Sequence, residues 1–252
     1  MITVDLPSPA ALEAASAAFT FALVGIGLLI VGSAVAAATW ARSLNGWALG
    51  GVSFVLSQTA QVVTLFLFGP LIAAFTSAPL QEASRAIILS TAARRVRGER
   101  PSAAFGFGHG AIDLLTSSLA LTLSAVIILG GIRDGSIFVG LSVEETDIMH
   151  AAAVFLVSQT LLSAALLVAQ GALMLGLHAL LTAIVLRAVV RGGGVRTIGR
   201  GLLLPAAIHT PVAVVRTLFP MATMPVLLGA LLVAILIYRR GQGVMAESAP
   251  NQ

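Results

Sequence analysis

Two charged residues, Glu82 and Arg85, lie inside a run from Leu71 to Ala93 that is otherwise almost wholly apolar. Because they are three residues apart, they share one face of a helix and lie about one turn from each other. In hydrocarbon each charge is costly unless it is paired or solvated in a cavity. The pair is therefore either a structural ion pair that fixes helix packing or part of a site in which a sheltered carboxylate acts as a general base.

Three histidines strengthen the second interpretation, because each lies nine residues from an arginine at the same end of its helix. The pairs are His109 with Arg100, His178 with Arg187, and His209 with Arg200, and Arg85 is likewise nine residues from Arg94. At the α-helical rise, nine residues span about 13–14 Å, with Glu82 about 18 Å and Asp113 about 19–20 Å deep on the same scale. Imidazoles can carry protons, bind a metal or stabilise an oxyanion. The spacing predicts one functional layer, to which four helices contribute.

A glycine-rich stretch surrounds the first of these histidines. His109 and Asp113 are four residues apart, so the carboxylate can orient the imidazole. Gly106 and Gly110 form a small-xxx-small face that permits close helix packing, and no strand or Lys-Ser/Thr indicates a phosphate loop. His150, near the outer end of its helix, is expected to be structural or exposed.

Composition places these residues in a membrane protein. The chain has 252 residues, 58% of them hydrophobic and 10% charged, with a mean hydropathy of +1.02, values typical of a polytopic helical bundle. We expect one integral membrane domain over residues 1–252, with a polar lead over 1–15 and a polar tail over 241–252. The absence of cysteine excludes disulfides, thiolate metal sites and a cysteine nucleophile.

The apolar runs predict an all-α fold of about seven spans plus a short extra helix. The expected spans are 16–40, 48–68, 71–93, 102–131, 163–190, 201–218 and 221–238. Gly69-Pro70 predicts a turn between the second and third spans. The long apolar stretch 149–190 is divided near Ser163 into a short outer helix and a spanning helix.

Charge distribution predicts the orientation, since cytoplasmic loops are rich in basic residues. With the N-terminus outside, eleven of the fourteen arginines lie in the cytoplasm and six of the ten acidic residues lie outside. The chain has no lysine, which is typical of GC-rich bacterial genomes. We expect a multi-pass protein of the bacterial cytoplasmic membrane with a cytoplasmic C-terminus. The arginines flank spans, so the basic balance indicates no nucleic-acid partner.

At the polar residues the chain resembles the YhfC-like family of intramembrane metalloproteases, akin to the CAAX-prenyl endopeptidase and bacteriocin-processing superfamily. The matching segments are Gly51-Val52-Ser53-Phe54-Val55-Leu56-Ser57-Gln58, Glu82-x-x-Arg85, and Gly106-Phe107-Gly108-His109-Gly110-Ala111-Ile112-Asp113, with His178 and His209 completing the set over roughly residues 48–215. The resemblance implies hydrolysis of peptide bonds within the membrane, on a membrane-protein or lipidated-peptide substrate.

The resemblance also implies residue roles. Glu82 would activate water and Arg85 would position it, while His109, His178 and His209 would hold the water or a metal and stabilise the oxyanion. With three histidines the cofactor is either none or Zn²⁺, whose catalytic sites use three protein ligands. Asp113 completes the expected catalytic set of six residues.

Several positions depart from the family pattern. Gln81, Asp113 and Gln170 stand where glutamates are expected, and Thr210-Pro211-Val212-Ala213 lacks the Asn or Asp expected after His209. Two alternatives to the protease therefore stay open. One is a proton-coupled transporter or channel that uses the same buried polar layer, and the other is a non-catalytic pseudoprotease.

Overall fold

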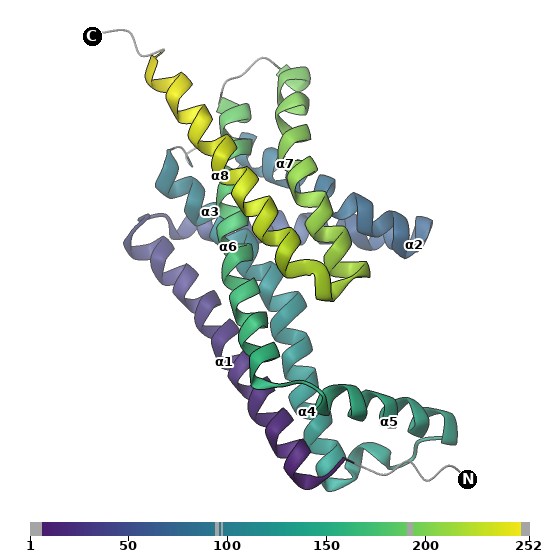
Figure 1. Cartoon of the computed structure of the whole chain (residues 1–252). Helices are drawn as coiled ribbons and strands as arrows, with labels where there is room; N and C mark the ends of the chain where they lie inside the picture. The colour runs from purple at the N-terminus through teal and green to yellow at the C-terminus, as the bar shows by residue number, and fades with distance from the viewer. Residues whose placement is uncertain (1–6, 94–95, 97, 191–193, 248–252) are drawn as a thin grey trace. The chain divides into compact units, whose positions relative to one another are not determined.

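The structure, a computed structural model, describes residues 7–93, 96, 98–190 and 194–247, all of whose regular elements are helical (Figure 1). The helices are α1 (Pro9–Thr39), α2 (Leu44–Ser90), α3 (Glu99–Leu114), α4 (Ala120–Asp134), α5 (Val143–Val157), α6 (Leu161–Val190), α7 (Gly194–Leu218) and α8 (Thr223–Glu247), with short turns η1 (Leu115–Leu119), η2 (Ser136–Phe138) and η3 (Pro220–Ala222). Some residues used above to orient the chain lie outside the described residues: Asp5, Arg94, Arg95, Arg97 and Arg191. The expected all-α fold is confirmed.

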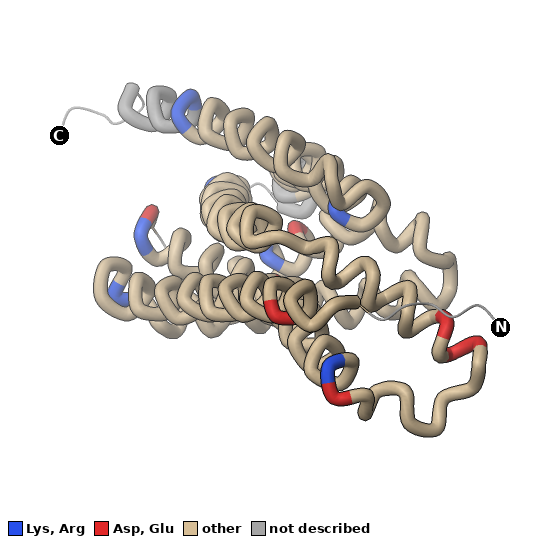
Figure 2. The backbone as a smooth tube through the Cα atoms, turned by 60° about the horizontal axis from the view of Figure 1, so that its bottom comes forward, with Lys and Arg blue, Asp and Glu red and all other residues tan. Residues whose placement is uncertain are grey.

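Among the described residues, six helical stretches are long and apolar enough to cross a membrane: 9–39, 44–90, 99–134, 161–190, 201–218 and 220–240. In Figure 2 these helices carry no charge over most of their length, and the charged positions gather near helix ends and at a few interior points. Many large apolar side chains on them are exposed. The fold is therefore that of a multi-pass membrane protein.

The first helix begins earlier than expected. Its first residue is Pro9, and the backbone N–H of Ala11 donates to Oγ of Ser8 at 3.3 Å. A proline suits the first helical turn because its missing N–H would have no partner there, and serine is a good N-cap. The helix therefore begins seven residues before the expected first span, within the predicted polar lead over 1–15.

Helix α2 doubles back on itself at Gly69, where φ is +81° and ψ is 175°. The following Pro70 suits the start of a new helical arm. Nε2 of Gln61 donates to the carbonyl oxygen of Ala73 at 2.9 Å, so residues on either side of the break lie together. Deeper in the arms, Oγ of Ser53 and Oγ of Ser84 are 3.4 Å apart. The two arms are therefore antiparallel, and the predicted turn at Gly69-Pro70 is confirmed.

The expected fourth span is one continuous helical run from Glu99 to Asp134, made of α3, η1 and α4. The turn η1 is π-helical, a wider turn that proteins often place near functional sites. It begins two residues after Asp113. Gly135, with φ +76°, ends α4 in the left-handed conformation.

The stretch 149–190 breaks slightly before the predicted position. Helix α5 ends at Val157 and α6 begins at Leu161. The backbone N–H of Ser163 donates to Oγ1 of Thr160 at 3.2 Å, and the N–H of Thr160 donates to Oγ of Ser163 at 2.8 Å. This reciprocal capping starts the helix at the threonine. The predicted division into a shorter outer helix and a longer apolar helix is present, with α5 ending six residues before Ser163 and α6 beginning two residues before it.

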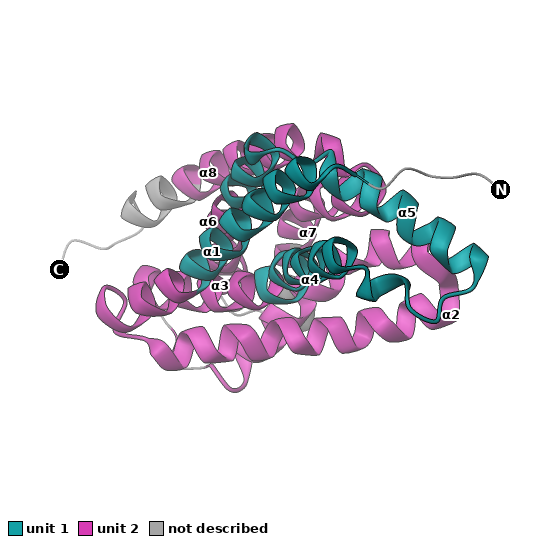
Figure 3. Cartoon of the chain, turned by 90° about the horizontal axis from the view of Figure 1, so that it is seen from below, with its two compact units in different colours: residues 1–30, 114–171 teal, residues 31–113, 172–252 magenta. Residues whose placement is uncertain are grey.

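The chain forms two compact units, coloured separately in Figure 3. Unit 1 comprises 1–30 and 114–171, and its core joins α1, α4 and α5 through residues such as Leu12, Leu129 and Leu156. Unit 2 comprises 31–113 and 172–252 and includes α2, α3, α7, α8 and the second part of α6. Every residue of the predicted site belongs to unit 2.

Candidate active site

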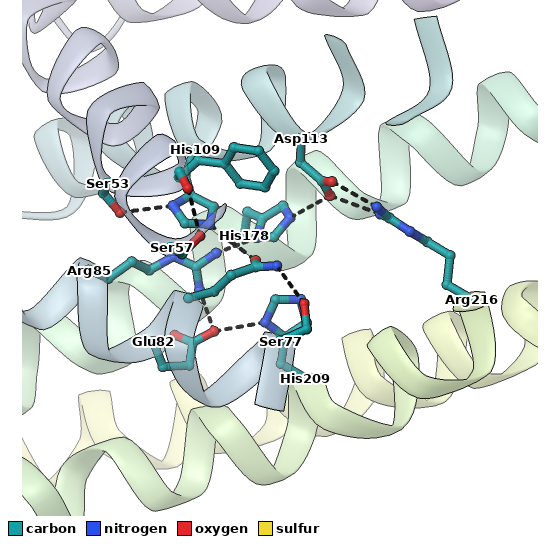
Figure 4. Close-up of polar contacts among 12 residues, drawn as sticks. Ser53, Ser57, Ser77, Glu82, Arg85, His109, Asp113, His178, His209 and Arg216 are labelled. Atoms are coloured by element: carbon teal, nitrogen blue, oxygen red, sulfur yellow. Dashed lines mark hydrogen bonds and ion pairs between the residues drawn. The ribbon is translucent and has the colours of Figure 1, made fainter. Parts of the chain in front are cut away.

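All six predicted site residues lie together inside unit 2 (Figure 4). Glu82 and Arg85 come from the second arm of α2, His109 and Asp113 from α3, His178 from α6 and His209 from α7. Each is at most 2% exposed. The ring centroids of His109 and His178 are 5.0 Å apart, and those of His178 and His209 are 5.2 Å apart. The single layer predicted from the spacing therefore exists, and the catalytic roles remain predictions.

Glycines of α3 permit this convergence. A Cβ at Gly106 would lie 2.6 Å from the carbonyl oxygen of His178 on α6, and one at Gly108 would lie 2.8 Å from Cα of Trp47 on α2. Both distances are far below van der Waals contact, so backbone packs against backbone on two sides of α3. At Gly110 a Cβ would meet the ring of His178 at 2.9 Å. The predicted packing face of Gly106 and Gly110 is confirmed, and it brings α3 against the helix that carries His178.

The charged residues and two of the histidines form one continuous series of polar contacts, called here the polar network. Nη1 of Arg85 donates to Oε1 of Glu82 at 2.5 Å, and the same Oε1 accepts from Nδ1 of His209 at 2.9 Å. Nη2 of Arg85 also contacts Nδ1 of His178. Nε2 of His178 lies 3.4 Å from Oδ2 of Asp113.

Arg216, on α7, is one end of the polar network. Its Nη1 and Nη2 donate to the two oxygens of Asp113 at 2.9 and 2.8 Å, a bidentate pair. Arg216 and His209 are seven residues apart on one helix, so both project from the same face. The polar network holds two carboxylates and two guanidinium groups, so with neutral histidines its formal charge is balanced. This balance explains how four charges are accommodated in an apolar interior.

The donors fix the protonation pattern of two histidines. A guanidinium group only donates, so Nδ1 of His178 accepts from Arg85 and its Nε2–H donates to Asp113. His109 lies between two neutral partners, with Oγ of Ser53 2.9 Å from Nδ1 and Oε1 of Gln81 3.2 Å from Nε2. An amide oxygen only accepts, so Nε2 of His109 carries the proton and Nδ1 accepts from the serine. Both rings are thus neutral and fully engaged.

His209 differs from the other two histidines. Its Nδ1–H donates to Glu82, which leaves Nε2 as the acceptor, and no described residue bonds to Nε2. The ring borders a small cavity of about 50 Å³. The cavity is lined by Ser77, Gln81, Asp113, Met174, His209, Val212, Ala213, Arg216 and Thr217. Glu82, His109 and His178, which belong to the same predicted layer, do not line it.

Two buried atoms of the polar network have no hydrogen-bond partner among the described residues. They are Oε2 of Glu82 and Nε of Arg85. An unpaired buried polar atom costs about 1–3 kcal/mol, and more when it is charged. Such an atom in an otherwise satisfied network is consistent with a bound water or with a catalytic role. Oε2 is therefore an acceptor left free beside His209.

The geometry does not fit a three-histidine zinc site. A catalytic zinc needs three ligand atoms about 2 Å from one point, but both ring nitrogens of His109 and of His178 are engaged with other side chains. Among the described residues, no three His, Asp or Glu side chains are grouped as metal ligands. The alternative of zinc on His109, His178 and His209 therefore has no support in the geometry.

Sequence reasoning missed Arg216 and Ser77, and it treated Ser53 and Gln81 only in relation to the family pattern. The signal for Arg216 was present, because it is a lone cation in the expected span 201–218, two helical turns from His209. Gln81 holds His109 and donates to Oγ of Ser77 at 3.4 Å. Gln170, another departure from the pattern, lies in unit 1.

His150 behaves as predicted. It lies on α5, outside the site, and its ring stacks on Phe138 with centroids 5.1 Å apart.

Comparison of the chain with protein-family models, with curated proteins and with solved structures gives no match.

Proposed function

We propose that the protein is an intramembrane endopeptidase in which Glu82 and His209 together form the general base. The carrying observation is the position of His209 between a buried carboxylate and a cavity. A carboxylate that accepts from one ring nitrogen orients the imidazole and stabilises its protonated form, leaving the other nitrogen to take a proton. The sequence resemblance to the YhfC-like family supports the same reaction on the same residues.

The proton balance of the reaction follows from this arrangement. Nε2 of His209 removes a proton from water as the water oxygen bonds to the scissile carbonyl carbon. Glu82 stabilises the resulting imidazolium, and the proton then passes to the leaving amide nitrogen as the carbon–nitrogen bond breaks. Glu82, expected from the sequence to take the proton itself, thus acts through His209, with Arg85 donating to the same carboxylate oxygen.

The cavity also presents hydrogen-bond donors where the substrate oxygen would become negative. Arg216 lines it and is 33% exposed in its side chain, and Gln81, whose side-chain amide can donate, lies on the same lining. Preorganised donors of this kind stabilise an oxyanion. A cavity of about 50 Å³ is large enough for water but not for a peptide, so a membrane-protein or lipidated-peptide substrate would reach it when the lining helices separate.

The proposal includes the placement of the chain in a bacterial cytoplasmic membrane, with the N-terminus outside and the C-terminus in the cytoplasm. The distribution of arginine supports this orientation. It places Arg42 and Arg239 on the cytoplasmic side and Glu144 outside. The site lies within the apolar helices, so hydrolysis would take place inside the membrane.

The test compares cleavage by wild type and by two variants, Glu82→Gln and His209→Gln, reconstituted with a library of membrane-spanning peptides. New peptide termini are identified by mass spectrometry. General-base catalysis contributes about 10²–10⁴-fold, so both variants should lose at least about 10²-fold in turnover.

Matched controls come from residues of the same types outside the site. Glu144→Gln and His150→Gln change one side chain each on α5 and should cleave like wild type. Folded wild-type protein that yields no fragments would refute the endopeptidase. Equal cleavage by wild type and His209→Gln would refute the assignment of the base.

A further inference from the structure

The turn of the α2 hairpin is surrounded by exposed apolar side chains. Residues 65–68 before the turn are all exposed, with Phe66 84% exposed, and Leu71, Ile72 and Phe75 follow on the second arm. Between Arg42 and Glu82 the sequence contains no charged residue. A turn that emerges into water normally carries polar or charged residues, and this one has none between Thr64 and Thr76.

The polar side chains nearest the turn bond to backbone carbonyls of their own hairpin rather than reaching outward. Oγ1 of Thr64 donates to Ala60 at 2.9 Å, and Oγ1 of Thr76 donates to Ile72 at 2.9 Å. Gln61 donates to Ala73 across the hairpin. At the break itself, Pro70 has no N–H, so one backbone donor fewer needs a partner. The donors of these three side chains are thus satisfied within the hairpin, and Oε1 of Gln61 has no partner among the described residues.

The exposed residues also indicate what covers them. Leu65, Phe66, Leu67 and Phe68 are consecutive, and successive residues of a helix are about 100° apart, so their side chains project in all directions around the arm. A single docked helix covers one stripe of its partner. Side chains exposed on every side fit a surrounding medium, and the hydrocarbon of lipid chains is the medium that solvates such residues.

The two ends of the hairpin lie together, away from the tip. One surface hollow is lined both by residues before and within the first turn of α2, Arg42 to Leu49, and by residues after its end, Ala92 to Val96. Within unit 2, Figures 1 and 3 both show the arms of α2 running crosswise to α7 and to the second part of α6. If those two helices cross the membrane, the arms of α2 extend along its plane.

We propose that α2 is an intramembrane hairpin that enters and leaves on the cytoplasmic side, with its tip (residues 65–75) surrounded by lipid acyl chains. The chain then crosses the membrane five times rather than the seven expected from the sequence. The orientation is the same in both cases, because a hairpin that crosses twice and one that does not cross return the chain to the same side. Only the position of the tip differs.

Because the protein has no cysteine, single cysteines report the position of the tip directly. The test variant is Phe68→Cys in the full chain, with Phe66→Cys as a second variant in case the first does not fold. Glu144→Cys serves as the outside control and Arg239→Cys as the cytoplasmic control, both at exposed positions. Each is treated with a membrane-impermeant maleimide in sealed vesicles of both orientations.

A thiol in hydrocarbon stays un-ionised and unreactive, so tip labelling should be at least about tenfold slower than either control from both sides. Labelling should appear once detergent or denaturant exposes the thiol. A bimane attached at the tip should be quenched strongly by lipids brominated on their acyl chains and weakly by lipids labelled at the headgroup.

Labelling of the tip from outside at the rate of Glu144→Cys would overturn the proposal and restore two crossings. A spontaneous disulfide between two copies of Phe68→Cys in the membrane would overturn it in favour of contact with a second copy. Acyl-chain quenching with protection from both sides supports it. None of these results depends on whether the protein cleaves peptides.

Discussion

The ion pair between Asp113 and Arg216 predicts an unequal response to removal of its two partners. The carboxylate is 3% exposed, whereas the side chain of Arg216 is 33% exposed. Arg216→Gln leaves a charged carboxylate buried without its bidentate partner, and removing one member of a buried pair costs about 3–5 kcal/mol. Asp113→Asn leaves a guanidinium group that can reach solvent in the cavity, and the loss is then about 1.5–3 kcal/mol for the charged hydrogen bonds.

The double variant Asp113→Asn/Arg216→Gln sharpens this prediction. It removes both charges, so it should be less destabilised than the sum of the single variants, with a coupling of about 0.5–3 kcal/mol. In Asp113→Asn and in the double variant alike, an amide oxygen remains as the acceptor for Nε2–H of His178. The rest of the polar network is therefore disturbed equally in both.

Stability is measured in mild detergent by titration with a denaturing detergent. Fluorescence of Trp40 and Trp47, the only tryptophans and both in unit 2, reports unfolding. An Asp113→Asn variant at least as unstable as Arg216→Gln, or a double variant whose loss equals the sum, would refute a buried, coupled pair.

Two further predictions concern residues that position the site. Gly106→Ala forces α3 away from Ala179 and should lower the free energy of unfolding by about 1–3 kcal/mol in the same titration. The control Gly130→Ala has open space around the added Cβ and should be neutral or stabilising. Equal losses of stability in the two variants would contradict the close packing. Ser53→Ala leaves Nδ1 of His109 without its buried donor and should lower the free energy of unfolding by about 1–3 kcal/mol. The control Ser124→Ala, at an exposed serine bonded to its own helix, should change stability by less than about 0.5 kcal/mol. A Ser53→Ala variant as stable as that control would exclude the contact.

The fold was largely predictable because a membrane leaves few choices. Apolar runs of sufficient length must be helical, since every backbone group needs an internal partner in hydrocarbon. Gly69-Pro70 indicated the turn in α2, because glycine adopts a positive φ without strain and proline suits the start of a helix. The start of α1 was missed because the alanines and the single acidic residue before Ser16 were interpreted as a polar lead. The signal was Ser8-Pro9, an N-cap followed by the first helical residue. The crosswise direction of α2 depends on packing against α7, which no local pattern records.

The site was predictable in membership and less so in connectivity. Equal spacing from the membrane edge identified Glu82, His109, His178 and His209, because depth in a membrane follows directly from helix rise. The side of the helix on which each group lies fixes its partner, and this depends on helix rotation. The spacing therefore could not show that Glu82 pairs with His209 or that Asp113 needs Arg216. Charge balance could have indicated the latter, because Glu82, Arg85 and Asp113 alone leave one buried negative charge without a counterion.

The order of the contacts in the polar network bears on the choice between the proposed enzyme and a proton-coupled transporter. A relay that carries protons across a membrane needs an open chain of groups whose ends reach opposite sides. Here the contacts start at Arg216 on α7, pass through Asp113, His178, Arg85 and Glu82, and return to α7 at His209. Two of the links are guanidinium groups, which do not release protons at physiological pH. A proton taken up by His209 therefore has no route past Arg85 into the rest of the polar network and can return to a molecule in the cavity, as the proposed hydrolysis would require.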